Sequence, residues 1–455
     1  MSALPPEVED IRQRTRTFIR EVVVPSEPRP GSTLDEAVLA DLQARAKTAG
    51  VFAPHVPTEW GGLGVPVEHW SPIFQEAGYS PIGPAVLGCM APDEGNMHML
   101  ARIGTADQKE RYLRPLAAGE VRSSFAMTEP HPGAGSDPAA LSTRAVRDGD
   151  EWVITGDKRF ISGAELCDFF IVMAATGDGD PKETAAEAAG SPAGGVSSAD
   201  NRSAEAAGSP ADNGSSAGAG KRRGQEATMF LVDRSAPGVE VGRSIHTVDT
   251  TIAGGHPYVR FEGVRVPESA VLGEPGKGFA YAQVRLAPAR LTHCMRWLGL
   301  ARRALDIALD RAEHRSVFGD VLARQGLAQE LIAASVIDIE TSDAIIAKTS
   351  LVLDGDQHEA NSLSSIAKVH CSEAIYRVID RAVQLTGGDG ISDELPLIQY
   401  LNEVRPFRIY DGSTETHKFA ISRRASSRRR KEVAAGAPRL DVVAGPRTET
   451  EEDAR

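Results

Sequence analysis

Cysteine is scarce in this chain of 455 residues, and its four cysteines lie far apart in the sequence. They are Cys89, Cys167, Cys294 and Cys371, and none belongs to a CxxC pair or to a cysteine–histidine spacing that binds a metal ion. We therefore expect a reduced, cytoplasmic protein without a structural metal.

Long apolar runs are missing as well. No stretch of about 18 consecutive apolar residues occurs, which excludes a membrane-spanning helix. The first 18 residues carry early acidic side chains and no apolar core, so we expect neither a signal peptide nor a transit peptide. An excess of positive charge is also absent. Lys+Arg 50 against Asp+Glu 63 gives a net charge of −13, which disfavours nonspecific binding to nucleic acid.

The patterns that are present divide the chain into regions, and a chain of this length is expected to hold about three domains of roughly 150 residues. Residues 1–122 carry apolar side chains at helical spacing, as at Val8, Ile11 and Phe18, which predicts a helical domain. Residues 123–272 contain short alternating or apolar runs separated by Gly and Pro. This pattern predicts a small antiparallel β barrel or sandwich.

Residues 273–425 are predicted to form a helical bundle, because segment 326–350 is apolar on two faces and must pack on two sides. Residues 177–226 are low-complexity sequence in which the word AEAAGSPA occurs twice, and we expect a disordered surface insertion there. Residues 426–455 begin with a basic run and are expected to form a flexible tail.

Two short motifs carry the functional prediction. Thr128-Glu129-Pro130 lies upstream, and Tyr410-Asp411-Gly412-Ser413-Thr414-Glu415 lies near the end of the bundle. In this order, on a helical, β and helical chain, they resemble the acyl-CoA dehydrogenase family over about residues 20–424. The resemblance implies an α+β fold with an N-terminal helical domain, a middle antiparallel β-barrel domain and a C-terminal four-helix bundle. It also implies FAD as cofactor.

The segment Phe125-Ala126-Met127-Thr128-Glu129-Pro130, followed by Gly133-Ala134-Gly135-Ser136-Asp137, resembles one half of the family's flavin site, with His131-Pro132 inserted. Backbone N–H groups and a hydroxyl on such a loop can stabilise negative charge on a reduced flavin. The resemblance implies that Phe125, Met127 and Thr128 contact the flavin. It places Ser136 near the pantetheine–phosphate part of coenzyme A.

A second segment, Lys158-Arg159-Phe160-Ile161-Ser162, resembles the family strand whose aromatic residue packs on the isoalloxazine ring. The resemblance implies that Phe160 takes this place and that the Ser162 hydroxyl lies near flavin N5. Without this context, the segment is a β-strand with one core aromatic residue.

Two further motifs resemble those that hold the distal half of FAD. Arg315 with Phe318-Gly319 and Gln325 matches a motif that contacts the FAD pyrophosphate of a neighbouring subunit, and an arginine fork suits a phosphate. The segment Gln384 to Gly390 matches the family's Gln-x-x-Gly-Gly-x-Gly, which implies adenosine contacts from Gln384, Gly387 and Gly388. The resemblance therefore implies a homotetramer, a dimer of dimers.

Segment 286–301 resembles the family's substrate-side helix, in which Arg290 matches an arginine and Ala287 replaces an acid. We expect Arg290, Gly412 and Ser136 to bind substrate. His293 could titrate near neutral pH, but we interpret it as a packed or exposed helix histidine.

Asp411 occupies the position of the family's catalytic glutamate, and Ser413 and Glu415 match positions that contact FAD. Alone, Asp-Gly-Ser-Thr is typical of a turn or a helix N-cap. The reaction needs a base for the α-proton of a thioester, and flavin and substrate around the carboxylate should raise its pKa. Aspartate reaches about 1.5 Å less than glutamate, and a 1 Å misplacement can cost about a hundredfold in rate.

One clade of the family resembles this chain more closely. It has aspartate in the Asp-Gly motif, a segment like 91–97 (Ala-Pro-Asp-Glu-Gly-Asn-Met) and one like 293–296 (His-Cys-Met-Arg), and it is linked to long-chain and 4-hydroxy acyl-CoA oxidation. The predicted function is FAD-dependent dehydrogenation of an acyl-CoA to a trans-2-enoyl-CoA in fatty acid β-oxidation. The electrons would pass to an electron-transfer flavoprotein.

Two other hypotheses remain open. An acyl-CoA oxidase or flavin monooxygenase would keep the fold, and the reaction of its reduced flavin with oxygen would distinguish it. A non-catalytic flavin- or DNA-binding relative is supported only by the basic run 423–431, and the net charge of −13 argues against it.

Overall fold

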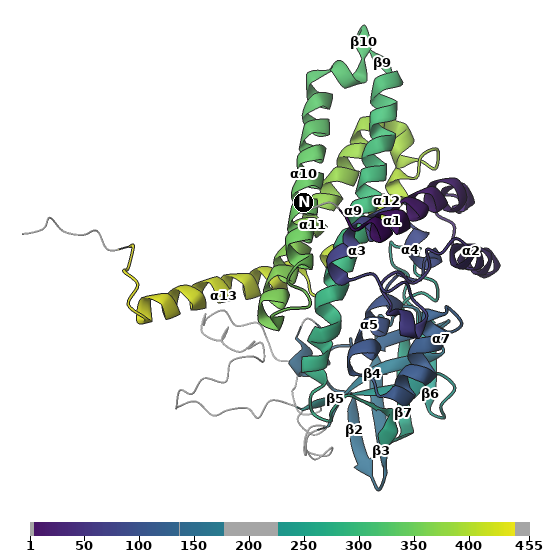
Figure 1. Ribbon diagram of the computed structural model, residues 1–455, viewed down its shortest axis with the longest axis vertical. Coiled ribbons are helices and arrows are strands. Elements are labelled where there is room, and N and C mark those ends of the chain that lie inside the picture. Colours follow the sequence, from purple (N-terminus) through teal and green to yellow (C-terminus); the bar gives the residue numbers. More distant parts are fainter. Residues whose placement is uncertain (1–3, 136, 177–225, 442–455) are drawn as a thin grey trace, which may run out of the picture.

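The computed structural model describes residues 4–135, 137–176 and 226–441. Ser136, almost all of the predicted insertion at 177–226 and the last part of the predicted tail lie outside these residues. Figure 1 shows long helices at one end of the molecule, a β-sheet at the other end, and N-terminal helices packed against both. None of the helices in the described part combines the length and apolarity needed to cross a membrane.

The N-terminal region is helical, as predicted. Its helices are α1 (Pro6–Phe18), α2 (Glu36–Thr48), α3 (Trp70–Gly78), α4 (Gly83–Val86), α5 (Asp93–Ile103), α6 (Ala106–Gln108) and α7 (Arg114–Ala117), with π-helical turns η1 (Ile19–Val23) and η5 (Lys109–Leu113). Asp35 caps α2 by accepting from the N–H groups of Ala37 and Val38. The region docks on the sheet through the ring of Tyr112, whose centroid lies 4.7 Å from that of Phe169.

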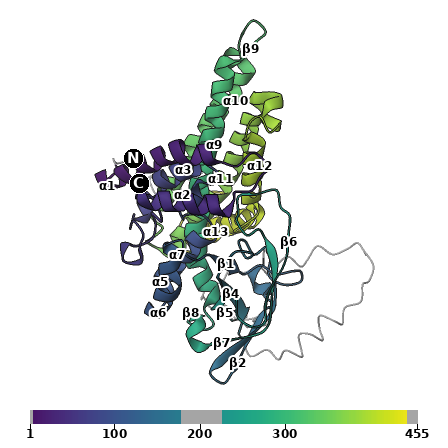
Figure 2. The same ribbon diagram turned by 90° about the vertical axis from the view of Figure 1, so that its right-hand side faces the viewer.

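The middle region forms an eight-stranded sheet. Its strands are β1 (Ser123–Ala126), β2 (Arg144–Asp148), β3 (Glu151–Lys158), β4 (Phe169–Ala175), β5 (Ala227–Asp233), β6 (Val239–Ser244), β7 (Pro257–Pro267) and β8 (Val271–Leu272). They pair in the order β6-β7-β3-β2-β4-β5-β8, with β1 beside β4. Figure 2 shows β6 on the side of the sheet away from α5.

The sheet is mixed, whereas the sequence patterns predicted an antiparallel one. Strand β1 pairs with β4 in parallel, and β2 meets β4 in parallel at Arg144 and Ala175. A parallel pair needs a long crossover, and the chain leaves the sheet between β1 and β2 to build the loop that contains Thr128-Glu129-Pro130. The antiparallel prediction therefore missed the parallel pairing, and the loop that goes with this pairing is the segment predicted to contact the flavin.

The C-terminal region is helical, as predicted. Its elements are α9 (Gly278–His314), β9 (Ser316–Val317), β10 (Asp320–Val321), α10 (Gly326–Ser350), α11 (Gln357–Thr386), η9 (Gly387–Ile391), α12 (Leu397–Val404), η10 (Arg405–Arg408) and α13 (Thr414–Ala434). Figure 1 shows α9, α10 and α11 side by side, with the β9–β10 hairpin at their far end.

Helix α13 extends to Ala434, so residues 426–434 are helical where a flexible tail was expected. Arginine, lysine and alanine favour helix, and Arg428 and Arg429 reach Glu432 at 3.7 and 3.3 Å, at i,i+4 and i,i+3 spacing. The charge run thus continues the helix that Ser413 begins.

Helices α3 and α9 cross at two glycines. A Cβ atom added at Gly299 would lie 2.1 Å from the Gln75 carbonyl oxygen, and one at Gly78 would lie 2.0 Å from that of Arg296. The backbones can approach so closely only because both positions lack a side chain. This crossing fixes the middle of α9 against the N-terminal helices.

We expect Gly299→Ala to lower the free energy of unfolding by roughly 1–3 kcal/mol, because the methyl group would overlap the backbone of α3. Urea unfolding measures the change. Gly326→Ala, at the start of α10 with no atom within 4 Å of the added Cβ, is the matched control and should not destabilise. Equal stabilities of the two variants would contradict the close crossing.

Candidate active site

The backbone of Asp411 and Gly412 is held in an uncommon conformation between η10 and α13. Asp411 has a φ of +53° and Gly412 a φ of +97°, and a non-glycine residue seldom adopts such an angle. The carbonyl oxygen of Asp411 accepts from Arg290 Nε and lies near His417 Nε2, both at 3.0 Å. Lys368 Nζ donates to the Gly412 carbonyl at 2.7 Å. Buried donors from α9, α11 and α13 thus maintain the strained turn.

The carboxylate of Asp411 points toward α9. Its Oδ2 atom lies 3.3 Å from His293 Nε2, and the two side chains are only 19% and 8% exposed. Burial raises the pKa of Asp411, but the hydrogen bond with His293 and the charges of Arg285 and Arg290 outweigh it and bring that pKa well below its usual range. The raised pKa expected for a carboxylate under flavin and thioester is not produced by the protein's own side chains.

Arg285 connects this end of the site with Phe125 on β1. Its guanidinium lies 4.2 Å from the centroid of the Phe125 ring, and its Nε donates to Asn96 Oδ1 at 2.8 Å. Asn96 in turn donates to the Ser123 hydroxyl at 2.8 Å. The structure therefore brings Asp411, Gly412 and Arg290 together, and Arg285 joins them to the predicted flavin residue Phe125.

The two predicted flavin segments lie side by side. Arg159 N donates to the Thr128 carbonyl at 2.8 Å, and Lys158 Nζ lies 3.3 Å from the Met127 carbonyl. Phe160, next along, is 42% exposed at a φ of +56°. A large aromatic side chain left exposed on a left-handed backbone suits a contact with a planar ligand.

Glu129 organises the loop that carries these residues. Its Oε2 accepts from the N–H and hydroxyl of Ser142, both at 2.6 Å, and from Ala134 N at 3.0 Å. Its Oε1 accepts from Thr143 N at 2.9 Å and from Lys158 Nζ at 2.8 Å. Both charged side chains are fully buried, so the loop is built around an internal ion pair.

Ser162 belongs to a chain of polar residues that the sequence did not reveal. Its hydroxyl lies 2.9 Å from His256 Nδ1, and His256 Nε2 lies 3.1 Å from Asp249 Oδ2. The carboxylate makes Nε2 the protonated nitrogen, which leaves Nδ1 to accept from the hydroxyl. No motif marks His256 or Asp249, because they precede β7 in an irregular segment.

The residues predicted for the distal half of the cofactor lie elsewhere in the chain. Arg315 and Gln325 flank the β9–β10 hairpin, which lies far from the sheet (Figure 1), and Phe318 lies in the turn of the hairpin, 99% exposed. Gln384, Gly387 and Gly388 are exposed at the end of α11, which an ion pair of 2.6 Å between Arg311 and Asp389 joins to the last turns of α9. One chain does not bring these two groups to Phe160.

The other predicted residues have local roles in the structure or lie outside it. Ser413 caps α13 by accepting from Thr416 N at 3.3 Å, and Glu415 is exposed in its first turn. Ser136 lies outside the described residues.

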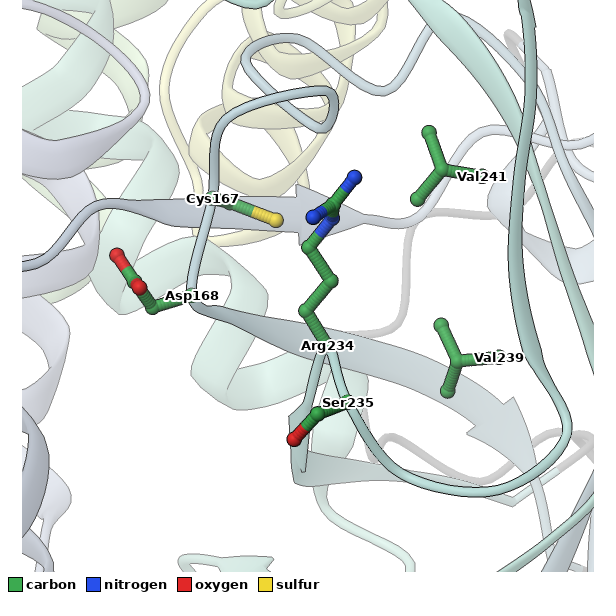
Figure 3. A pocket seen from close by; sticks show the side chains of 6 residues that line it. All are labelled: Cys167, Asp168, Arg234, Ser235, Val239 and Val241. Carbon is green, nitrogen blue, oxygen red and sulfur yellow. The ribbon is translucent and has the colours of Figure 1, made fainter.

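The cavity in Figure 3 is separate from this site. It measures about 350 Å³ and lies in the sheet region between Cys167, Arg234 and Val241. Burial raises the pKa of the Cys167 thiol to about 12, so the thiol stays protonated and weakly nucleophilic.

Comparison with known proteins places the chain in a family. Residues 5–120, 124–209 and 276–426 match the acyl-CoA dehydrogenase N-terminal, middle and C-terminal domains. FadE2 of Mycobacterium tuberculosis, assigned as an acyl-CoA dehydrogenase, is 34% identical over 94% of this chain and 97% of its own length. The chain belongs to the acyl-CoA dehydrogenase family.

Other relatives are longer than this chain. Acyl-CoA dehydrogenase family member 10 of mouse is 32% identical over 92% of this chain, which spans 37% of that protein. Member 11 of chicken is 31% identical over 91% of this chain, which spans half of it. A solved structure from Mycobacterium abscessus, assigned to the same family, has a TM-score of 0.78 and is 31% identical over 94% of this chain and all of its own.

FAD is the cofactor of acyl-CoA dehydrogenases, and this chain's residues fit it. The exposed ring of Phe160 and the half-buried Met127 and Thr128 offer a surface for an aromatic ring system. Arg159 Nε is buried without a hydrogen-bond partner among the described residues. Gly387 and Gly388 leave open space where a Cβ would lie, which suits a close approach of a dinucleotide. The enzyme is therefore an oxidoreductase of the flavoprotein type.

Proposed function

We propose that this protein is an FAD-dependent acyl-CoA dehydrogenase that converts an acyl-CoA thioester to a trans-2-enoyl-CoA, with Asp411 as the base. One observation carries the proposal. The Asp411 carboxylate is largely buried on a strained turn that Arg290, His417 and Lys368 hold by its backbone. Backbone strain maintained by buried side chains is characteristic of a functional residue.

In the reaction, the Cα–H bond of the thioester breaks and Asp411 accepts the proton, while a hydride leaves Cβ and a C=C bond forms between the two carbons. FAD, when bound, supplies the acceptor for this hydride. The positive charges of Arg285 and Arg290 lie near Asp411, so they also favour negative charge developing on the thioester carbonyl. Arg290, Gly412 and Ser136 would bind the substrate.

We assign the isoalloxazine to Phe125, Met127, Thr128, Phe160 and Ser162 of one chain, with Ser413 and Glu415 nearby. The distal half of FAD would lie on Arg315, Phe318, Gln325, Gln384, Gly387 and Gly388 of a neighbouring chain. The β9–β10 hairpin beside Arg315 lies far from the sheet within one chain (Figure 1), which supports a homotetramer in which each FAD bridges two subunits.

Asp411 in place of glutamate supports membership of the clade linked to long-chain and 4-hydroxy acyl-CoA substrates. The relatives include family members 10 and 11, which agrees with this proposal. An electron-transfer flavoprotein would accept the electrons, and fatty acid β-oxidation in the cytoplasm would be the setting.

Anaerobic titration of the FAD-loaded enzyme with a panel of acyl-CoA thioesters tests the reaction. We expect the main flavin absorbance band to bleach, and the most effective thioester defines the substrate class. Rapid reoxidation by oxygen with product bound would favour an oxidase or monooxygenase instead. A flavin that no thioester bleaches would contradict the proposal, and DNA binding that weakens with salt would then support the non-catalytic alternative.

Arg315→Ala is expected to weaken FAD binding about 10- to 100-fold, because charge-assisted hydrogen bonds to a phosphate would be lost. Equilibrium dialysis of FAD against the apoprotein measures the change. The matched control is Arg324→Ala. Arg324 is an exposed arginine in η8 (Leu322–Arg324) and lies seven residues after Val317, where β9 ends. Equal effects of both substitutions would contradict a specific role for Arg315.

A further inference from the structure

His293 lies between the side chains of Asp411 and Arg296. Arg290, His293 and Arg296 are spaced three residues apart on α9, so their side chains share one face of the helix. Arg296 Nη2 lies 2.8 Å from His293 Nδ1. A guanidinium carries only donors, so Nδ1 must accept this hydrogen bond and is unprotonated. The ring proton is then on Nε2, the atom that lies 3.3 Å from Asp411 Oδ2.

Arg296 cannot move away without breaking other buried contacts. Its side chain is fully buried, and its Nη1 donates to the Cys89 carbonyl at 2.9 Å. The Glu94 carboxylate lies 3.6 Å away, and the Thr292 hydroxyl donates to that carboxylate. Its backbone lies at the glycine crossing of α3 and α9. The fold therefore fixes the donor that determines the His293 tautomer.

We propose that His293 is a positioning residue that stays neutral, with its proton on Nε2, and aims the Asp411 carboxylate at the substrate. The proposal rests on the proposed function, since it assigns His293 a role only if Asp411 is the base. It accounts for the shorter side chain, because a carboxylate with about 1.5 Å less reach tolerates less misorientation.

The charges around the pair favour these protonation states. Burial and the charge of Arg296 lower the pKa of His293, although Asp411 and Glu94 oppose them. The groups that face Asp411 and His293 are Arg285, Arg290 and Arg296 on α9, Lys368 on α11, His417 on α13, Tyr410 beside Asp411, and Glu94 on α5. Cations outnumber acids in this set, which keeps Asp411 ionised and disfavours a proton on His293.

Two substitutions in the FAD-loaded enzyme separate positioning from packing. In His293→Gln, the amide can accept from Arg296 and donate to Asp411, so both hydrogen bonds are retained. In His293→Leu, a side chain of similar bulk makes neither. His98→Leu removes another buried histidine, which lies on α5 with its ring edge-on to Trp70, 5.8 Å between centroids.

We expect His293→Leu to slow flavin reduction by acyl-CoA about a hundredfold, with a change in KM of about threefold or less. Exchange of the α-proton with D2O, followed by mass spectrometry of the thioester, should slow in parallel, because it reports the base alone. His293→Gln should keep both rates within about fivefold of wild type, and His98→Leu should keep kcat within about twofold.

The dependence of kcat/KM on pH distinguishes the two roles, because a loss of packing alone would not shift it. A hydrogen bond to the ionised form lowers the pKa of a carboxyl group, so its loss in His293→Leu should shift the acid limb of kcat/KM upward by about one unit. His293→Gln should restore the limb toward its wild-type position.

Several outcomes would overturn the inference. If His293→Leu had wild-type rates and a wild-type pH profile, the inference would be wrong but the proposed function would stand. Equal defects in His293→Leu and His293→Gln would have the same meaning. A wild-type enzyme that neither exchanges the α-proton nor bleaches its flavin would overturn both. If His293→Leu does not fold, ¹⁵N NMR of histidine-labelled wild type, with His293→Gln to assign the signal, decides between the tautomers. A proton on Nδ1 at neutral pH would refute the proposal.

Discussion

Asp411→Ala is expected to slow flavin reduction by the best acyl-CoA about 10³- to 10⁴-fold, because it removes the proposed general base. Stopped-flow bleaching of the FAD-loaded enzyme under anaerobic conditions measures this rate. Asp411→Asn, which keeps the shape of the side chain and removes its basicity, should be about as slow. Asp306→Ala is the matched control. Asp306 lies on the exposed side of α9 and accepts a hydrogen bond from Tyr79, so we expect this substitution to leave the rate unchanged.

The alanine variant must also retain its cofactor for this result to concern chemistry. The turn at Asp411 is held through carbonyl oxygens by Arg290, His417 and Lys368, and these contacts survive removal of the side chain. We therefore expect wild-type FAD content and a similar melting temperature. An Asp411→Ala enzyme that bleaches at a rate close to wild type would show that another group takes the proton.

Asp411→Glu tests whether the site is built for the shorter carboxylate. The added methylene would push the carboxylate about 1.5 Å further along a path already occupied by His293. We expect the rate to fall roughly 10- to 100-fold rather than rise. A faster enzyme would mean that the site still accommodates the glutamate of the wider family.

Much of the fold could be predicted from the sequence because it depends on local patterns. The periodicity of apolar side chains gave the order of helical, β and helical regions, and turn residues gave the strand boundaries. The parallel pairing of β1 with β4 could not be predicted in this way, since it joins strands that are separated by two others. The helical extension of α13 was missed because a basic run resembles a solvated tail, although its residues favour helix.

The candidate site was predictable only in part, for a similar reason. Motifs identify Asp411, Phe160 and Arg290 as candidates, and these assignments remain predictions. No motif pairs His293 with Asp411, because α9 and the turn before α13 meet only in the folded chain. The same holds for Ser162, His256 and Asp249. In both cases a predicted site residue, Asp411 or Ser162, contacts polar side chains that no sequence pattern identifies.

Lys158→Met is expected to lower the free energy of unfolding by about 3–5 kcal/mol, because it leaves the Glu129 carboxylate buried without its charged partner. This is a large share of the roughly 5–15 kcal/mol that stabilises a typical domain. Burial lowers the pKa of Lys158 to about 8, with Glu129 opposing the shift, so the ammonium is still charged at neutral pH. Urea unfolding of the purified protein measures the loss.

The matched control for Lys158→Met is Arg265→Met, which breaks exposed ion pairs with Asp148 and Glu151 on the same sheet. Exposed pairs contribute about 0–1 kcal/mol, so this variant should unfold almost like wild type. Because Glu129 also orders the N–H groups of Ala134, Ser142 and Thr143, Lys158→Met should weaken FAD binding together with stability. If stability fell while FAD affinity stayed at the wild-type level, the ion pair would support the sheet but not the loop that carries Met127 and Thr128.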